Sequence, residues 1–135
     1  MTLQTLLVHQ YMSRRLITLT SETEILHALQ TFIKNDISSA PVVDDAGGLI
    51  GILTQKDCMQ VALNAAYHSE YGGLVADFMS TQVSTISPDE SIVDAAKRFL
   101  ENRYHRYPVL KNDRLVGVLS RRDVIRALGD AWQWQ

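Results

Sequence analysis

The feature that most constrains the fold of this chain is an internal repeat. Met12-Ser13 recurs 67 residues later as Met79-Ser80, and Pro41-Val42 recurs at the same offset as Pro108-Val109. One residue is then missing from a turn of the second copy, after which the offset is 66, as it is for Asp57 and Asp123. Such an ordered series of matches indicates a tandem duplication, in which each copy folds in the same way.

Each copy predicts the order β-α-β-β-α, which is an α/β (α+β) fold. Period-2 and period-3.6 patterns of apolar residues separate the strands from the helices, and two short apolar runs joined by a polar turn predict a hairpin. The expected strands are Leu16–Leu19, Pro41–Val43 and Leu49–Leu53 in the first copy, and Val83–Ile86, Pro108–Leu110 and Leu115–Leu119 in the second. The closing helices are expected at about Gln55–Tyr67 and Arg121–Ala131.

The first helix of each copy is amphipathic. In the second copy Ser87 is expected as the N-cap, with Pro88 at the first helical position and Glu90 completing a capping box. The inward faces are predicted to carry Ile25, Leu29, Phe32 and Ile33, and at the equivalent positions Ile92, Ala96, Phe99 and Leu100.

The repeat also sets the expected domain organisation. The first copy is assigned to residues 1–71, with a leading helix within Leu3–Met12, and the second to residues 72–135, with a leading helix within Leu74–Met79. His68–Gly73 is the linker, because its glycine pair breaks regular structure. At 135 residues the two copies together form one module, since each alone is near the lower limit for independent folding.

Composition excludes several classes of protein. A formal charge of −2 argues against a surface that binds nucleic acid or membrane as a whole. The single cysteine, Cys58, excludes an internal disulfide, and no run approaches the ~20 apolar residues of a membrane span. A cytoplasmic protein is therefore expected.

The repeated motifs resemble the cystathionine-β-synthase (CBS) domain, present as a tandem pair or Bateman module. The resemblance covers nearly the whole chain. It is carried by Ser39–Val43 with Arg106–Leu110, and above all by Gly51-Ile52-Leu53-Thr54-Gln55-Lys56-Asp57 with Gly117-Val118-Leu119-Ser120-Arg121-Arg122-Asp123. The resemblance implies two repeats packed sheet to sheet about a pseudo-two-fold axis, with an adenosine-containing ligand bound in the clefts between them.

Both copies place a carboxylate at a predicted helix start. Thr54-x-x-Asp57 and Ser120-x-x-Asp123 have the spacing of a capping box, which is a structural role. The resemblance adds a functional one: Asp57 and Asp123 would accept hydrogen bonds from ribose hydroxyls, while Thr54 and Ser120 reach ribose or phosphate.

Basic residues distinguish the second copy. Arg121 and Arg122 are predicted in the first turn of a helix, where a positive charge is unfavourable because that end of the helix dipole is also positive. A bound anion would offset this unfavourable interaction. His105-Arg106-Tyr107-Pro108-Val109 is similar to the element with which the gamma subunit of AMP-activated protein kinase holds phosphate. The alternative is a solvated basic face. The first copy has Ser38-Ser39 and Gln55-Lys56 instead, so it is expected to bind phosphate less strongly, to hold a neutral adenosine-type ligand, or to stay empty.

The resemblance also implies contacts to the base. The backbone before each proline would face adenine, and a threonine side chain would lie beside it, although these threonines also suit a strand. Tyr107 replaces the usual aliphatic residue and could stack on the base or crowd the pocket. The residues concerned are Thr18, Ser39, Ala40 and Pro41 in the first copy, and Thr85, Arg106, Tyr107 and Pro108 in the second.

These residues predict a regulatory module rather than an enzyme. No nucleophile, base and electrophile come together, Cys58 is expected to be buried, and the four histidines lack a metal-binding spacing. AMP, ADP or ATP is the expected ligand, with no required cofactor and an effector protein in trans. A homodimer is expected through the closing helices, including Val61 with Leu63 and Val124 with Leu128. The Trp132/Trp134 tail is either a further dimer contact or a frayed end. The alternative is a scaffold that binds no ligand.

Overall fold

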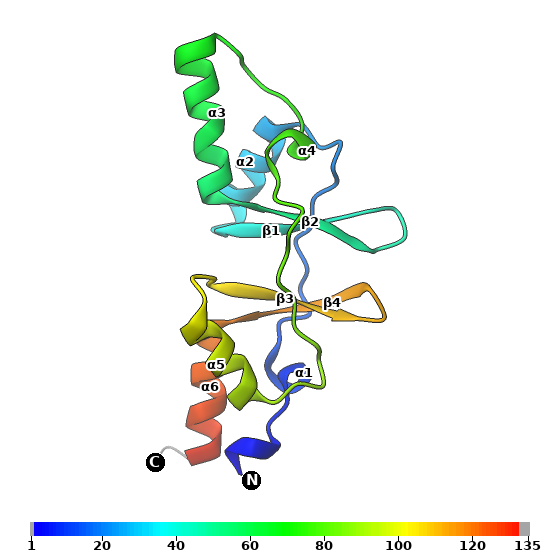
Figure 1. Ribbon diagram of the computed structural model, residues 1–135, viewed down its shortest axis with the longest axis vertical. Coiled ribbons are helices and arrows are strands. Elements are labelled where there is room, and N and C mark those ends of the chain that lie inside the picture. The colour runs from blue at the N-terminus through cyan, green and yellow to red at the C-terminus, as the bar shows by residue number, and fades with distance from the viewer. Residues whose placement is uncertain (1, 133–135) are drawn as a thin grey trace. The chain divides into compact units, whose positions relative to one another are not determined.

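The structure, a computed structural model, describes residues 2–132 and contains two compact units (Figure 1). Unit 1 combines the residues up to Leu16 with those from Ser84 onward, and unit 2 is Ile17–Val83. The compact units differ from the sequence repeats because each leading segment packs with the hairpin of the other copy. Trp134 lies outside the described residues.

Both units contain a hairpin, an amphipathic helix, a closing helix and a short leading helix, as the α/β fold class predicted, and unit 1 has the short η1 in addition. Unit 1 contains η1 (Leu3–Thr5), α1 (Val8–Tyr11), α5 (Ile92–Glu101), β3 (Arg106–Lys111), β4 (Arg114–Ser120) and α6 (Arg121–Trp132). Unit 2 contains α2 (Ile25–Asn35), β1 (Ser39–Val43), β2 (Leu49–Thr54), α3 (Gln55–His68) and α4 (Val75–Phe78). The predicted hairpins, closing helices and short leading helices are confirmed.

Each hairpin is extended on both sides by single bridging residues. β1 and β2 pair antiparallel, as do β3 and β4. In unit 1, Ile86 pairs in parallel with Val109 of β3, and Ser13 pairs antiparallel with Val118 of β4. In unit 2 the corresponding bridges join Leu19 to Val42 and Ser80 to Ile52. The extended runs expected at Leu16–Leu19 and Val83–Ile86 are thus reduced to one paired residue each.

The predicted start of the second copy's first helix is wrong. α5 begins at Ile92, and the N-cap is Ser91, whose Oγ accepts a hydrogen bond from the backbone N–H of Asp94 at 3.1 Å. Residues 88–90 instead bind the leading segment, because Val8 N donates to the Glu90 carbonyl at 2.9 Å and His9 N donates to the Pro88 carbonyl at 3.0 Å. A tertiary contact therefore replaces the local capping signal.

Each unit has its own apolar core between the hairpin and the helices. In unit 1 the leading segment contributes Leu6, Val8, Tyr11 and Met12 to this core. The inward faces of the amphipathic helices were partly mispredicted: Ile33 is 82% exposed and its equivalent Leu100 is 88% exposed. Conversely, Val61 and Val124, expected on an exposed face, are buried in their own units.

A glycine in each central strand permits the close approach of the leading segment. A Cβ atom on Gly117 of β4 would lie 2.6 Å from Met12 Sδ and 3.0 Å from the Ser13 carbonyl oxygen. A Cβ atom on Gly51 of β2 would meet Met79 Sδ and the Ser80 carbonyl oxygen, both at 2.9 Å. The repeated Met-Ser and Gly elements of the sequence therefore form one packing unit, built twice.

We predict that Gly117→Ala lowers the free energy of unfolding by about 1–3 kcal/mol, the usual cost of overpacking. The added methyl group must displace Met12 and the backbone at Ser13. Urea unfolding of the variant beside Gly48→Ala measures this, because the methyl group at Gly48 meets only the Asp44 carboxylate. Equal losses of stability in the two variants would contradict the assigned packing.

Candidate functional site

In unit 2 the residues singled out in the sequence gather at one end of the hairpin. Ser39, the first residue of β1, pairs with Thr54, the last residue of β2. Gln55 N, at the start of α3, donates to the Ser38 carbonyl at 2.9 Å, which ties the helix start to the beginning of β1. Thr18 lies beside them, since the next residue, Leu19, donates its N–H to the Pro41 carbonyl at 2.9 Å.

Unit 1 repeats this arrangement. Arg106 pairs with Ser120, and Arg121 N donates to the His105 carbonyl at 3.3 Å. Ile86 N donates to the Pro108 carbonyl at 3.0 Å, which places Thr85 next to β3. The fold therefore assembles each half of the predicted residue set within a single unit.

Within residues 2–132, the strand edge at this junction extends beyond its pairing with Leu19. Leu19 N donates to Pro41 O, and Val43 N donates to Leu19 O, so alternate residues of β1 point their backbone groups toward this edge. By this alternation the backbone groups of Ser39 point the same way, past the end of the Leu19 pairing. Arg106 holds the equivalent place in β3, because Ile86 bonds Pro108 and Leu110.

The capping boxes predicted at both helix starts are confirmed. In unit 2, Thr54 N donates to Asp57 Oδ2 at 2.9 Å, and Asp57 N donates to Thr54 Oγ1 at 3.2 Å. In unit 1, Ser120 N donates to Asp123 Oδ2 at 2.8 Å, and Asp123 N donates to Ser120 Oγ at 3.3 Å. Both carboxylates are half-buried at a helix N-terminus, with one oxygen used by the cap.

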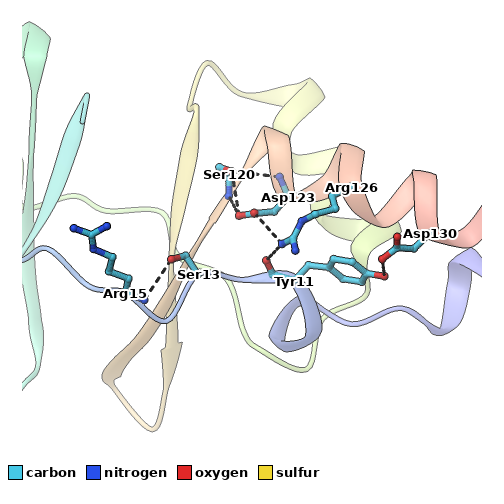
Figure 2. A network of polar contacts seen from close by, with 7 residues as sticks. All are labelled: Tyr11, Ser13, Arg15, Ser120, Asp123, Arg126 and Asp130. Carbon is cyan, nitrogen blue, oxygen red and sulfur yellow. Dashed lines mark hydrogen bonds and ion pairs between the residues drawn. The ribbon is translucent and has the colours of Figure 1, made fainter. Parts of the chain in front are cut away.

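The second oxygen distinguishes the two carboxylates (Figure 2). Asp123 Oδ1 lies 3.3 Å from a guanidinium nitrogen of Arg126, which also donates to the Tyr11 carbonyl at 2.9 Å. The Tyr11 hydroxyl in turn donates to Asp130 Oδ2 at 2.8 Å. Within residues 2–132, Asp57 Oδ1 has no hydrogen bond or ion pair.

This network was missed by sequence reasoning, although a signal existed. Comparison of equivalent positions across the repeats shows Arg126 against Gln60, Tyr11 against Phe78, and Asp130 against Asn64. At each of these three positions, unit 1 has a polar or charged group where unit 2 has a neutral or apolar one. Such differences are invisible when each copy is read for its own periodicity.

Charge is distributed unequally between the units. Of the thirteen Lys and Arg residues, only Lys34 and Lys56 belong to unit 2, so unit 1 carries eleven basic against seven acidic residues, and unit 2 two against eight. His105, Arg121 and Arg122 are exposed and Arg106 is half-buried. Within the described part of the chain none of these four side chains forms an ion pair.

The side chain of Tyr107 lies in the core of unit 1 and not in a ligand pocket. Its side chain is 0% exposed, and its ring lies 4.8 Å from that of Phe99. Its hydroxyl donates to the Arg98 carbonyl at 3.1 Å. The hypothesis that this ring stacks on a base or crowds the pocket is therefore wrong in this arrangement, because the ring fills the core beneath α5.

The other predicted residues are found as follows. Ala40, Pro41 and Pro108 are buried, Thr85 is half-buried, and Thr18 is exposed. Cys58 is a buried free thiol, and burial, followed by the charge of Asp57, raises its pKa. Within residues 2–132 no group of three or more His, Cys, Asp or Glu could hold a metal ion, and no helix is both long and apolar enough to cross a membrane.

Burial is the main reason that the pKa of Tyr11 is raised above 10.0, and the hydrogen bond and charge of Asp130 raise it further. The folded chain therefore retains the phenol proton at a pH where the unfolded chain loses it. We predict that this contribution to stability is complete below about pH 10 and is lost as the pH rises through the folded pKa. Urea unfolding between neutral and alkaline pH measures the loss.

The matched variants are Tyr11→Phe and Tyr67→Phe, since Tyr67 is exposed. Tyr11→Phe should reduce the alkaline loss of stability, whereas Tyr67→Phe should leave it unchanged. The same alkaline slope in wild type and Tyr11→Phe would show that the buried phenol is not responsible.

Comparison with known proteins extends these observations. The family model of the CBS domain matches twice, at residues 8–64 and 75–130. A CBS domain-containing protein of Dictyostelium discoideum is 32% identical over 132 residues, which cover 90% of each chain. The chain spans about half the length of several other curated relatives, for example 44% of an uncharacterised protein of Methanocaldococcus jannaschii that is 30% identical over 125 residues.

Two solved structures are similar in fold and sequence. The crystal structure of CBSX2 in complex with AMP has a TM-score of 0.83 and 27% identity, over 93% of this chain and 97% of that one; CBSX2 is a protein of Arabidopsis thaliana. The CBS domain pair of protein MJ0100, in complex with 5′-methylthioadenosine and S-adenosyl-L-methionine, has a TM-score of 0.75 and 29% identity, over 92% and 96%.

Proposed function

The chain belongs to the CBS-domain family as a tandem pair, and we propose that it is a regulatory module that binds an adenosine-containing nucleotide of the AMP, ADP or ATP type. The observation that carries this proposal is the junction of unit 1. There a capping carboxylate, Asp123, lies at the same end of the hairpin as Arg106, Arg121, Arg122 and His105, whose side chains form no ion pair within residues 2–132.

The chemistry of the junction suits the three parts of such a ligand. Asp123 can accept hydrogen bonds from ribose hydroxyls, and the planar forks of Arg106, Arg121 and Arg122 can each donate two hydrogen bonds to phosphate. The backbone groups of Arg106 can pair with the polar edge of adenine. Thr85 and Ser120 add hydroxyl groups beside them.

Unit 2 has the same junction with less positive charge. Asp57 and Thr54 repeat the cap, and Thr18 and the backbone of Ser39–Pro41 repeat the strand edge. Gln55 and Lys56 stand in place of the two arginines. We therefore propose that unit 1 binds the charged nucleotide, and that unit 2 binds phosphate less strongly, takes a neutral adenosine ligand or remains empty.

The relatives support the ligand class. CBSX2 binds AMP and the MJ0100 pair binds 5′-methylthioadenosine and S-adenosyl-L-methionine, all of which contain adenosine. Regulation would follow from the linkage between ligand and conformation: a nucleotide shifts the chain toward the state that it binds more tightly, and a partner protein binds that state. The described residues assemble no nucleophile with a base, so we propose a regulator rather than an enzyme. We propose that it acts in a reducing, cytoplasmic setting.

We predict that AMP binds the purified chain and raises its melting temperature by several degrees at a concentration of 100 times Kd, where binding stabilises the fold by about 2.7 kcal/mol. Asp123→Asn should weaken binding 10-fold or more, because a hydrogen bond to a charged group contributes about 1.5–3 kcal/mol. Arg106→Ala combined with Asp123→Ala should abolish most of the thermal shift. Isothermal titration with AMP, ADP, ATP and S-adenosylmethionine measures the affinities.

Asp57→Asn is the matched control, since it changes the equivalent carboxylate of the less basic unit. It should leave most of the AMP affinity intact. If no adenosine ligand at millimolar concentration binds or shifts the melting temperature, the proposed function is refuted. A partner bound equally well with and without nucleotide would support the alternative, a scaffold without ligand.

We also propose that two copies associate through their exposed helix faces. Three exposed apolar positions occur twice at equivalent places: Leu26, Ile33 and Met59 in unit 2, and Val93, Leu100 and Ile125 in unit 1. In unit 1, Leu100 and Ile125 border a groove of about 540 Å³ between α5 and α6. These side chains, with Leu63, replace Val61 and Val124 as the expected dimer contacts.

We predict that Leu100→Glu and Ile33→Glu convert a dimer to a monomer without loss of folding, because both side chains are largely exposed within one chain. Light scattering coupled to size exclusion measures the mass, and circular dichroism checks the fold. Lys34→Glu and Lys97→Glu, at exposed positions on the same helices, are the controls. A wild-type chain that is monomeric at high micromolar concentration would contradict this association.

A further inference from the structure

The carboxylate of Asp123 is held from two directions (Figure 2). Its Oδ2 atom accepts hydrogen bonds from Ser120 N at 2.8 Å and Ser120 Oγ at 3.0 Å. Its Oδ1 atom lies 3.3 Å from the Arg126 guanidinium. With two contacts on Oδ2 and one on Oδ1, the plane of the carboxylate cannot rotate freely.

Arg126 is itself held in place, although its side chain is 57% exposed. It donates to the Tyr11 carbonyl at 2.9 Å, and its guanidinium carbon lies 5.4 Å from the centre of the Tyr11 ring. The Tyr11 ring is buried in the core of unit 1, and its hydroxyl bonds Asp130. A surface arginine that spans a backbone carbonyl, an aromatic ring and a carboxylate has lost the freedom of an ordinary exposed side chain.

Unit 2 provides an internal comparison. Gln60 replaces Arg126 and donates instead to Asn64 Oδ1 at 2.8 Å, one turn along α3. Phe78 stands in the place of Tyr11. Among the described residues, 2–132, no group bonds Asp57 Oδ1, which lies beside a groove of about 610 Å³ that Asp57, Gln60 and Phe78 help to line. The same capping box therefore presents a restrained carboxylate in one unit and a less restrained one in the other.

We infer that Arg126 is a positioning residue that sets the orientation of the Asp123 carboxylate for the ribose of a bound nucleotide, an inference that rests on the proposed function. A carboxylate accepts hydrogen bonds from two adjacent hydroxyls only when its plane is turned toward both. A group held in that orientation before binding loses little entropy when the ligand arrives. Arg126 thereby increases the preference of unit 1 for ribose over 2′-deoxyribose.

The test compares two ligands in the full-length chain, AMP and 2′-deoxy-AMP, by isothermal titration. Arg126→Gln, which gives unit 1 the residue of unit 2, should lower the ratio of the two affinities by about 3- to 10-fold, the scale of one ordinary hydrogen bond. The ratio of affinities for AMP and adenosine, which reports on phosphate, should remain unchanged. Arg126→Lys should fall between, because one ammonium group cannot reproduce the planar fork.

Gln60→Ala, at the equivalent position of unit 2, is the matched control and should leave both ratios as in the wild type. A purely structural role for Arg126 would lower the affinities for AMP and 2′-deoxy-AMP by the same factor, and that result overturns the inference. An unchanged preference for ribose in Arg126→Gln also overturns it. If the wild-type chain binds none of the three ligands, the proposed function fails first, and the two failures are thus distinguishable.

Discussion

The pairing of each leading segment with the hairpin of the other copy is the constraint on which the rest of the structure depends. Ser13 pairs with Val118 and Ser80 pairs with Ile52, and in both places a glycine leaves room for the preceding methionine. A repeat of this size is near the limit at which a chain buries enough apolar surface to fold alone. The borrowed segment supplies part of each core, so neither unit is complete with its own repeat alone.

This exchange also determines the surroundings of the two carboxylates. The leading segment brings Tyr11 to α6, and Tyr11 supplies the carbonyl and the ring against which Arg126 rests. In unit 2 the other leading segment brings Phe78 to the equivalent place. One duplicated framework thus places two equivalent caps beside different neighbours, so a repeat can keep its fold while the surroundings of its two carboxylates differ.

Most of the local structure could be predicted from the sequence, because it depends on residues close together in the chain. The hairpins follow from two short apolar runs around a polar turn, and the caps at Thr54 and Ser120 follow from a three-residue spacing. Prediction went wrong where a distant segment competes with a local signal. Ser87 has good capping chemistry, but residues 88–90 are used to bind α1, and the helix begins only at Ile92.

The faces of the helices show the same division. Periodicity correctly predicted that the cores contain Ile25, Phe32, Ile92 and Phe99. Periodicity could not show that Ile33 and Leu100 are exposed. The apolar stripe of each helix is wider than the surface that packs against the hairpin, so the stripe also includes residues that lie outside the core. Tyr107 was misjudged for a related reason: alternation along a strand says that neighbouring side chains face opposite ways, and not which face is the core.

The sequence by itself determined the duplication, the β-α-β-β-α order, the positions of the two capping carboxylates and the concentration of arginines in the second copy. Each of these depends on spacing or composition, which are properties of the chain before it folds. Only the tertiary structure decided which repeat each leading segment joins and which neighbour holds each carboxylate. Contacts such as that between Tyr11 and Arg126 link residues more than a hundred positions apart, and no local pattern encodes them.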